Sequence, residues 1–252
     1  MTKTNQQKVK DFLINNGVII VMFILVIYTG FTSDNFFTKN NFMNILMNMS
    51  SRLVIALGIA GCVITAGCDL SAGRMIGFGA CISGMLLQRM DYSGKFFPDM
   101  QPLNVFVVAL IAMLVCAAFG TVTGFFIAYL NVPPFIATLA MMEIVYGIGL
   151  IVTNATPLGG YVEQYTNVSN GKFLGINYLI WIAIIVAAIT WFIFNMTRHG
   201  KYMYAIGGNP QAAEVAGVPV KATMILIYMK AAAMYGLAGF MLGAKSGGAF
   251  VQ

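Results

Sequence analysis

Charged residues are scarce in this chain of 252 residues: they make up 9% of it, against about 25% in a typical soluble domain. Hydrophobic residues make up 59%, and apolar runs of roughly 18 to 28 residues recur along the length. This composition excludes a soluble globular domain and indicates helices that satisfy their backbone hydrogen bonds inside a lipid bilayer. In a membrane protein the Lys and Arg residues behind the net charge of +6 set the orientation in the bilayer, so we expect no nucleic-acid partner.

Signatures of catalysis and metal binding are also absent. His199 is the single histidine, so a histidine-based metal site or catalytic dyad would lack its second member. No Walker A loop is present, because the pair Gly171-Lys172 lacks the preceding glycine and the following hydroxyl residue. We expect no metal, no cofactor and no enzymatic activity, so any ATP-driven step requires a separate nucleotide-binding protein. The four cysteines form no C-x-x-C pair and are expected to be small core residues: Cys62, Cys68, Cys81 and Cys116.

The apolar runs predict an all-α polytopic membrane protein, a single membrane domain over residues 1–252. Basic residues precede the first run and no cleavage site follows it, which predicts an uncleaved span with a cytoplasmic N-terminus. Six crossings return the chain to the cytoplasm at Thr197, and the cytoplasmic connection 197–221 is basic, as expected on that side. The seven predicted spans cover residues 12–31, 42–68, 74–88, 103–130, 134–152, 177–196 and 222–240.

The connection 197–221 contains the clearest local signal, a short capped helix. Asn209 is a good N-cap, Pro210 stands at the first helical position, and Gly217 is placed to stop the helix. Glu214 offers a charge that could orient a partner. An amphipathic helix on the membrane surface is the alternative interpretation, although such a helix usually carries larger apolar anchors. Three small residues give the helix an apolar face that a groove on a partner could hold: Ala212, Ala213 and Ala216.

A polar break, GCDLSAGR over residues 67–74, separates two apolar runs. An acid and a base beside a membrane span are costly unless they are paired or hydrated. One interpretation is a broken helix that lines a transport path with Asp69, Ser71 and Arg74. The other is that Asp69 caps the following helix while Arg74 pairs nearby or reaches the interface. Asn131, in the Asn-Val-Pro-Pro sequence that ends the fourth run, is a further candidate for the path.

Three of these segments together resemble the membrane permease of bacterial binding-protein-dependent ABC importers for monosaccharides, in the ribose/galactose branch. They are GCDLSAG at 67–73, AYLNVPPFI at 128–136, and AIGGNPQAA at 205–213 followed by Gly217. The resemblance covers essentially the whole chain. Family members continue through further glycine-rich spans, so we expect this chain to be a C-terminally truncated version of a larger permease fold.

The resemblance implies an ATP-driven importer that brings a monosaccharide, galactose or methyl galactoside, across the bacterial inner membrane. The implied partners are a cytoplasmic ATP-binding subunit, an extracytoplasmic sugar-binding protein and a second copy of the permease. By the same resemblance, residues 209–217 correspond to the coupling helix that docks on the ATPase, and residues 69–74 lie near the translocation path. The alternative is an ATP-independent secondary transporter or channel for a small polar solute.

Overall fold

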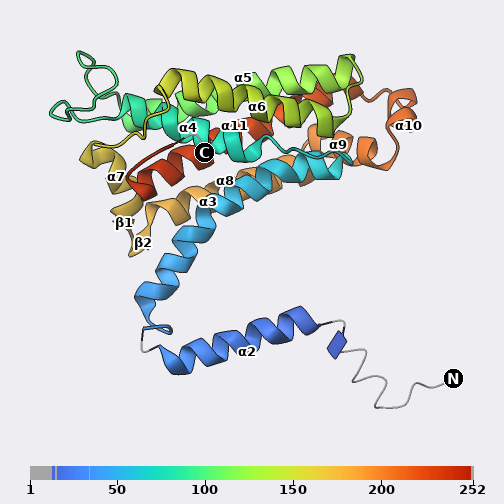
Figure 1. Cartoon of the computed structure of the whole chain (residues 1–252). Coiled ribbons are helices and arrows are strands. Elements are labelled where there is room, and N and C mark those ends of the chain that lie inside the picture. Colours follow the sequence, from blue (N-terminus) through green and yellow to red (C-terminus); the bar gives the residue numbers. More distant parts are fainter. Residues whose placement is uncertain (1–12, 15, 34, 251–252) are drawn as a thin grey trace. The chain divides into compact units, whose positions relative to one another are not determined.

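The computed structural model describes residues 13, 14, 16–33 and 35–250. The chain divides into two compact units, residues 1–46 and 47–252, each of which is described by itself. The first contains α2 (Gly17–Thr32) and the beginning of α3 (Lys39–Ile64) (Figure 1). The basic N-terminal residues and the predicted start of the first span at residue 12 lie outside the described residues.

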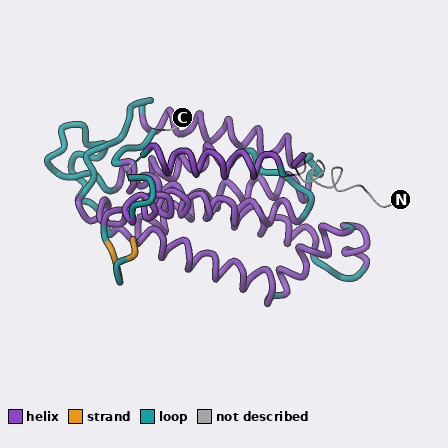
Figure 2. The backbone as a smooth tube through the Cα atoms, turned by 90° about the horizontal axis from the view of Figure 1, so that it is seen from below, coloured by secondary structure: helices purple, strands orange, loops and turns teal. Residues whose placement is uncertain are grey.

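The larger unit is built almost entirely of helices, and its two short strands form a small antiparallel hairpin (Figure 2). After α3, the elements follow in this order: α4 (Ala72–Leu86), α5 (Val105–Tyr129), α6 (Pro134–Thr153), α7 (Glu163–Asn170), β1 (Lys172–Phe173), β2 (Ile176–Asn177), α8 (Tyr178–Met196), α9 (Arg198–Gly208), α10 (Pro210–Val215) and α11 (Val220–Ser246).

Five of the described helices are long and apolar enough to cross a membrane: α3, α5, α6, α8 and α11. The remaining two predicted spans correspond to α2 and α4, which are apolar helices of 16 and 15 residues. At about 1.5 Å per residue, α4 is about 22 Å long, shorter than the ~30 Å hydrocarbon core. The all-α membrane fold is confirmed, while the count of seven full spans stays a prediction.

Two predicted span ends are wrong. The second span was expected to reach residue 68, but α3 ends at Ile64. Ala66 there takes up a left-handed conformation (φ 56°), and the Gly67 N–H bonds back to the Cys62 carbonyl. The seventh span was expected to end at residue 240, whereas α11 continues to Ser246 and ends where Gly247 takes up a left-handed conformation (φ 69°).

The central helix of the larger unit is α11, of whose apolar stretch 56% is buried. It packs against α4 and α5 at glycines that leave no space for a side chain. A Cβ on Gly124 of α5 would lie 2.8 Å from the Ile225 Cα, and a Cβ on Gly79 of α4 would lie 3.0 Å from the Gly236 Cα. The backbones therefore approach more closely than any larger residue permits, as is common between helices in membranes.

Candidate functional site

The helix α10 has the capping that its sequence predicts. The Asn209 Oδ1 accepts a hydrogen bond from the Ala212 N–H at 3.0 Å, and Pro210 occupies the first helical position. The helix ends at Val215, and Gly217 directly after its C-cap has a left-handed φ of 84°. The next N–H, of Val218, bonds back to the Ala213 carbonyl at 3.0 Å. Both ends of this short helix are thus fixed by local hydrogen bonds.

The exposed side of α10 differs from the predicted apolar face in one residue. Ala213 is buried against the chain itself and is not available to a partner. Residues two positions apart lie on opposite sides of a helix, so turning Ala213 inward turns Val215 outward, where it is 91% exposed. Sequence reasoning missed Val215 because the helix is too short to show a period. The outer face of α10 therefore consists of Gln211 and Val215, with Ala212 and Glu214 exposed on its flanks, and Ala216 is exposed just beyond the helix.

The helix α9 connects α10 to the spanning helices. It begins at the Thr197 hydroxyl, which accepts a hydrogen bond from the Gly200 N–H at 3.3 Å. His199 in its first turn has a buried Nε2 atom that finds no hydrogen-bond partner in the described part of the chain. Burial, and then the positive charge of Lys230, lower the pKa of His199 to about 4. The imidazole is therefore neutral near pH 7.

In the polar break between α3 and α4, the Asp69 carboxylate accepts hydrogen bonds from Ser71 and from Tyr235. The Asp69 Oδ1 accepts from the Ser71 hydroxyl at 2.6 Å and from the Ser71 N–H at 3.0 Å. The Asp69 Oδ2 accepts from the Tyr235 hydroxyl of α11 at 3.0 Å. A second tyrosine, Tyr228, donates to the Cys68 carbonyl at 3.4 Å. Asp69 and Ser71 were both predicted as path candidates, but no sequence signal links Asp69 to a tyrosine 166 residues away.

The other two path candidates are Arg74 in the first turn of α4 and Asn131 after the end of α5. The Arg74 guanidinium lies over the ring of Tyr146 of α6, 4.0 Å from its centroid, in a cation–π contact. Asn131 is exposed in the connection between α5 and α6, with a left-handed φ of 52°. The break approaches this connection, because a Cβ on Gly67 would lie 3.7 Å from the Pro134 Cγ. Asp69 and Ser71 are thus in contact, Arg74 faces α6, and Asn131 marks an exposed turn.

Two cavities that the sequence did not predict lie away from the polar break and from α10. One of about 640 Å³, between α5, α7, α8 and α11, is lined mostly by aliphatic and aromatic side chains, including Phe106, Trp181 and Phe240. The other, of about 480 Å³, lies between α3, α4 and α11 and includes Arg52 and Lys245. Neither contains a residue of the predicted site.

The cysteines of the larger unit are all free thiols. Three of them are buried, whereas Cys68 in the polar break is partly exposed. Within residues 13–14, 16–33 and 35–250, no three or more His, Cys, Asp or Glu side chains gather in a way that could hold a metal ion.

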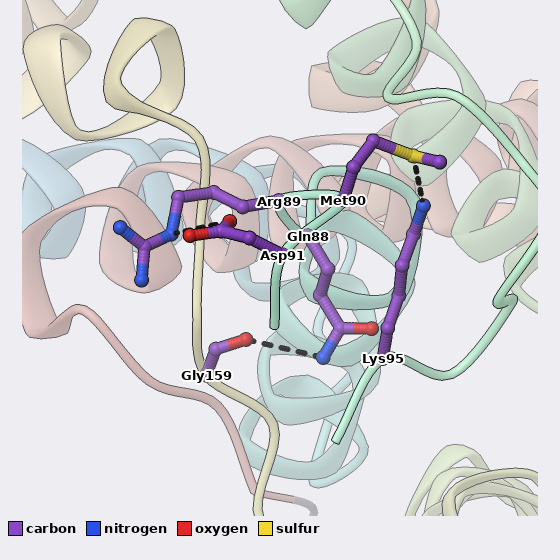
Figure 3. A network of polar contacts seen from close by, with 6 residues as sticks. All are labelled: Gln88, Arg89, Met90, Asp91, Lys95 and Gly159. Atoms are coloured by element: carbon purple, nitrogen blue, oxygen red, sulfur yellow. Dashed lines mark hydrogen bonds and ion pairs between the residues drawn. The ribbon is translucent and has the colours of Figure 1, made fainter. Parts of the chain in front are cut away.

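The end of the larger unit remote from α10 is closed by hydrogen-bonded loops (Figures 1 and 3). The buried Gln88 connects them: its Nε2 donates to the Gly159 carbonyl at 3.1 Å, and its Oε1 accepts from the Phe96 N–H at 2.7 Å. Arg89 and Asp91 form an exposed ion pair at 3.6 Å, which contributes little to stability. The buried amide of Gln88 therefore joins the connection between α4 and α5 to the connection between α6 and α7.

Comparison with known proteins places the chain among transport proteins. Residues 41–252 match a family model described as the branched-chain amino acid transport system / permease component. The galactose/methyl galactoside import permease protein MglC of Escherichia coli K12 is 38% identical over 99% of this chain and 76% of its own length. The protein of the same name from Haemophilus influenzae is 39% identical with the same coverage. The ribose import permease protein RbsC of Escherichia coli K12 is 30% identical over 92% of this chain and 70% of its own length. No solved structure gives a significant match.

Proposed function

The chain belongs to the permease family of the branched-chain amino acid transport type, and from this premise we propose that it carries galactose or methyl galactoside into the cell as part of an ABC importer. Its activity is transport, not catalysis, and it is a multi-pass protein of the inner membrane. One observation supports the choice of sugar: three relatives named for galactose and methyl galactoside are 37–39% identical over 99% of the chain and a fourth is 34% identical over 91%, against 30% over 92% for a relative named for ribose.

The energy for this transport comes from a separate ATP-binding subunit. The chain has no Walker A loop of its own. The outer face of α10 is the docking surface for that subunit. It is short, firmly capped and exposed, and Val215 supplies an apolar anchor while Glu214 supplies a charge. Docking on α10 requires residues 197–221 to be cytoplasmic, and hence the N-terminus as well if the chain crosses the membrane seven times.

The remote end of the larger unit faces the opposite side of the membrane under this orientation. The loops ordered by Gln88 are there and form the surface that receives an extracytoplasmic sugar-binding protein. A second copy of the permease completes the translocation path. Asp69, Ser71, Arg74 and Asn131 lie toward the cytoplasmic end of this path, where hydroxyl and carboxylate groups can exchange hydrogen bonds with a passing sugar.

Uptake of radiolabelled sugar into proteoliposomes tests the proposal. The chain is reconstituted with its ATP-binding and sugar-binding subunits, and galactose, methyl galactoside and ribose are compared with and without ATP. We expect ATP-dependent accumulation of galactose and methyl galactoside, in preference to ribose. Uptake by the chain alone at the same rate without ATP would instead establish an ATP-independent transporter or channel.

A further inference from the structure

We propose that α9 is a mechanical link that transmits the movement of α10 to the polar break around Asp69, through a contact between Gly207 and Ile64. The proposal rests on the proposed function, since it takes α10 as the docking helix. It assigns a positioning role to Gly207 and to α9, which resemblance and sequence pattern alone do not identify.

The first step is the connection between α9 and α10, which consists of the single residue Asn209. Asn209 ends one helix and begins the other. Its backbone N–H bonds to the Ala205 carbonyl of α9 at 3.1 Å, while its side chain caps α10 at the Ala212 N–H. A displacement of α10 by a docked ATPase is therefore passed to the end of α9 without a loop to absorb it.

The second step is the contact of α9 with α3. Met203 and Ile206 anchor α9 by burial, at 1% and 2% exposure. The next residue along, Gly207, packs its backbone against the carbonyl of Ile64, and a Cβ at this position would overlap that oxygen. Gly208 differs completely, because a Cβ there would have nothing within 4 Å. In the last turn of α9, Gly207 therefore packs against α3, whereas a Cβ on Gly208 would point into open space.

The third step is the position of that contact in α3. Ile64 is the last residue of the helix, and a turn of two residues separates it from the polar break, which begins at Gly67. The break is tethered on its other side to α11 by the two tyrosine hydroxyls, from Tyr228 to Cys68 and from Tyr235 to Asp69. A displacement of Ile64 therefore changes the conformation of residues 65–69, because their far end is held by α11. Asp69 is the charged group that this change displaces.

A thiol probe of Cys68 tests the link directly, because Cys68 lies in the break and is the partly exposed cysteine. The full chain is assembled with its ATP-binding subunit in nanodiscs, and the rate of maleimide labelling is measured with and without a non-hydrolysable ATP analogue. A Cys68→Ser variant gives the background from the buried cysteines. We expect the labelling rate of the unaltered chain to depend on the nucleotide.

Gly207→Ala and Gly208→Ala form a matched pair for this assay, since both replace a glycine by alanine in the same helical turn. We expect Gly207→Ala to lose the nucleotide dependence of Cys68 labelling and the ATP-dependent uptake, while it still binds the ATP-binding subunit. We expect Gly208→Ala to keep all three. If Gly207→Ala keeps its nucleotide response, or if both variants lose it equally, the link is wrong.

The tether at the far side supplies a second test that does not depend on the folding of Gly207→Ala. Tyr235→Phe removes the hydrogen bond to Asp69 and keeps the ring, and Tyr165→Phe removes a comparable buried hydrogen bond to the Phe240 carbonyl, away from the break. We expect only Tyr235→Phe to alter Cys68 labelling. An unchanged response in Tyr235→Phe overturns the link, whereas absence of ATP-dependent uptake by the unaltered complex overturns the proposed function instead.

Discussion

The helix α10 depends on one side-chain hydrogen bond at its start, so removing the Asn209 cap should weaken docking of the ATP-binding subunit. Replacing an Asn cap by Ala costs about 1 kcal/mol of helix stability. A helix of six residues is marginal by itself, so the loss is not absorbed by further turns. If the partner binds only the folded helix, a loss of about 1 kcal/mol lowers the apparent affinity by about fivefold.

The assay is the equilibrium binding of the purified ATP-binding subunit to the chain in nanodiscs, for the unaltered chain and three variants at Asn209. We expect Asn209→Ala to weaken binding by about fivefold, because Ser and Asp are good caps and Ala is not. Asn209→Ser and Asn209→Asp should bind within a factor of about two of the unaltered chain. The thermal unfolding of all four proteins should be similar, since the cap is local to an exposed helix.

Two outcomes would refute this reasoning. Equal weakening by Ala, Ser and Asp would mean that the Asn209 amide itself contacts the partner. Unchanged binding by Asn209→Ala would mean that the tertiary contacts of Ala213, and not the cap, hold the helix in place.

Three further predictions follow from backbone geometry and burial. Gly124→Ala places a Cβ 2.8 Å from the Ile225 Cα and should lower the free energy of unfolding by about 1–3 kcal/mol, as measured by thermal unfolding in detergent. Gly147→Ala, whose Cβ has nothing within 4 Å, should leave it unchanged. Equal melting temperatures of the two variants would contradict the close packing of α5 and α11. Gly217→Ala should cost about 1–2 kcal/mol and weaken docking, because φ is 84° there although the space is open; Gly217→Asn should recover part of the loss. The pKa of His199 is lowered to about 4, so the neutral form contributes stability that is complete above pH 6.5 and is lost as the pH falls toward 4; the unfolding temperature of His199→Gln should fall less between pH 7.5 and 5.

Local chemistry accounts for the parts of the site that could be predicted from the sequence. Asn209, Pro210 and Gly217 act on their own neighbours within a few residues, so their roles can be read from spacing alone. The contact of Asp69 with Ser71 is local in the same way. The long apolar runs predict helices because the backbone N–H and C=O groups of a segment inside lipid must form hydrogen bonds with one another.

The parts that could not be predicted depend on packing between distant segments. Tyr235 reaches Asp69 only because α11 passes beside the break. The burial of Ala213 depends on which side of α10 faces the chain, and the bounds of α9 were hidden by three glycines in eleven residues. Those glycines weaken the helical pattern in the sequence, yet Gly207 and Gly200 are required there because each packs against a backbone carbonyl.

The glycine contacts of α11 also determine which parts of the molecule can move during transport. Gly79, Gly124 and Gly236 fit backbone against backbone, so α4, α5 and α11 cannot slide past one another by one residue without placing a side chain where only hydrogen fits. We therefore expect these three helices to move as one unit. On this expectation, a change in the opening of the permease comes from movement of the helices around them, α3, α6 and α8.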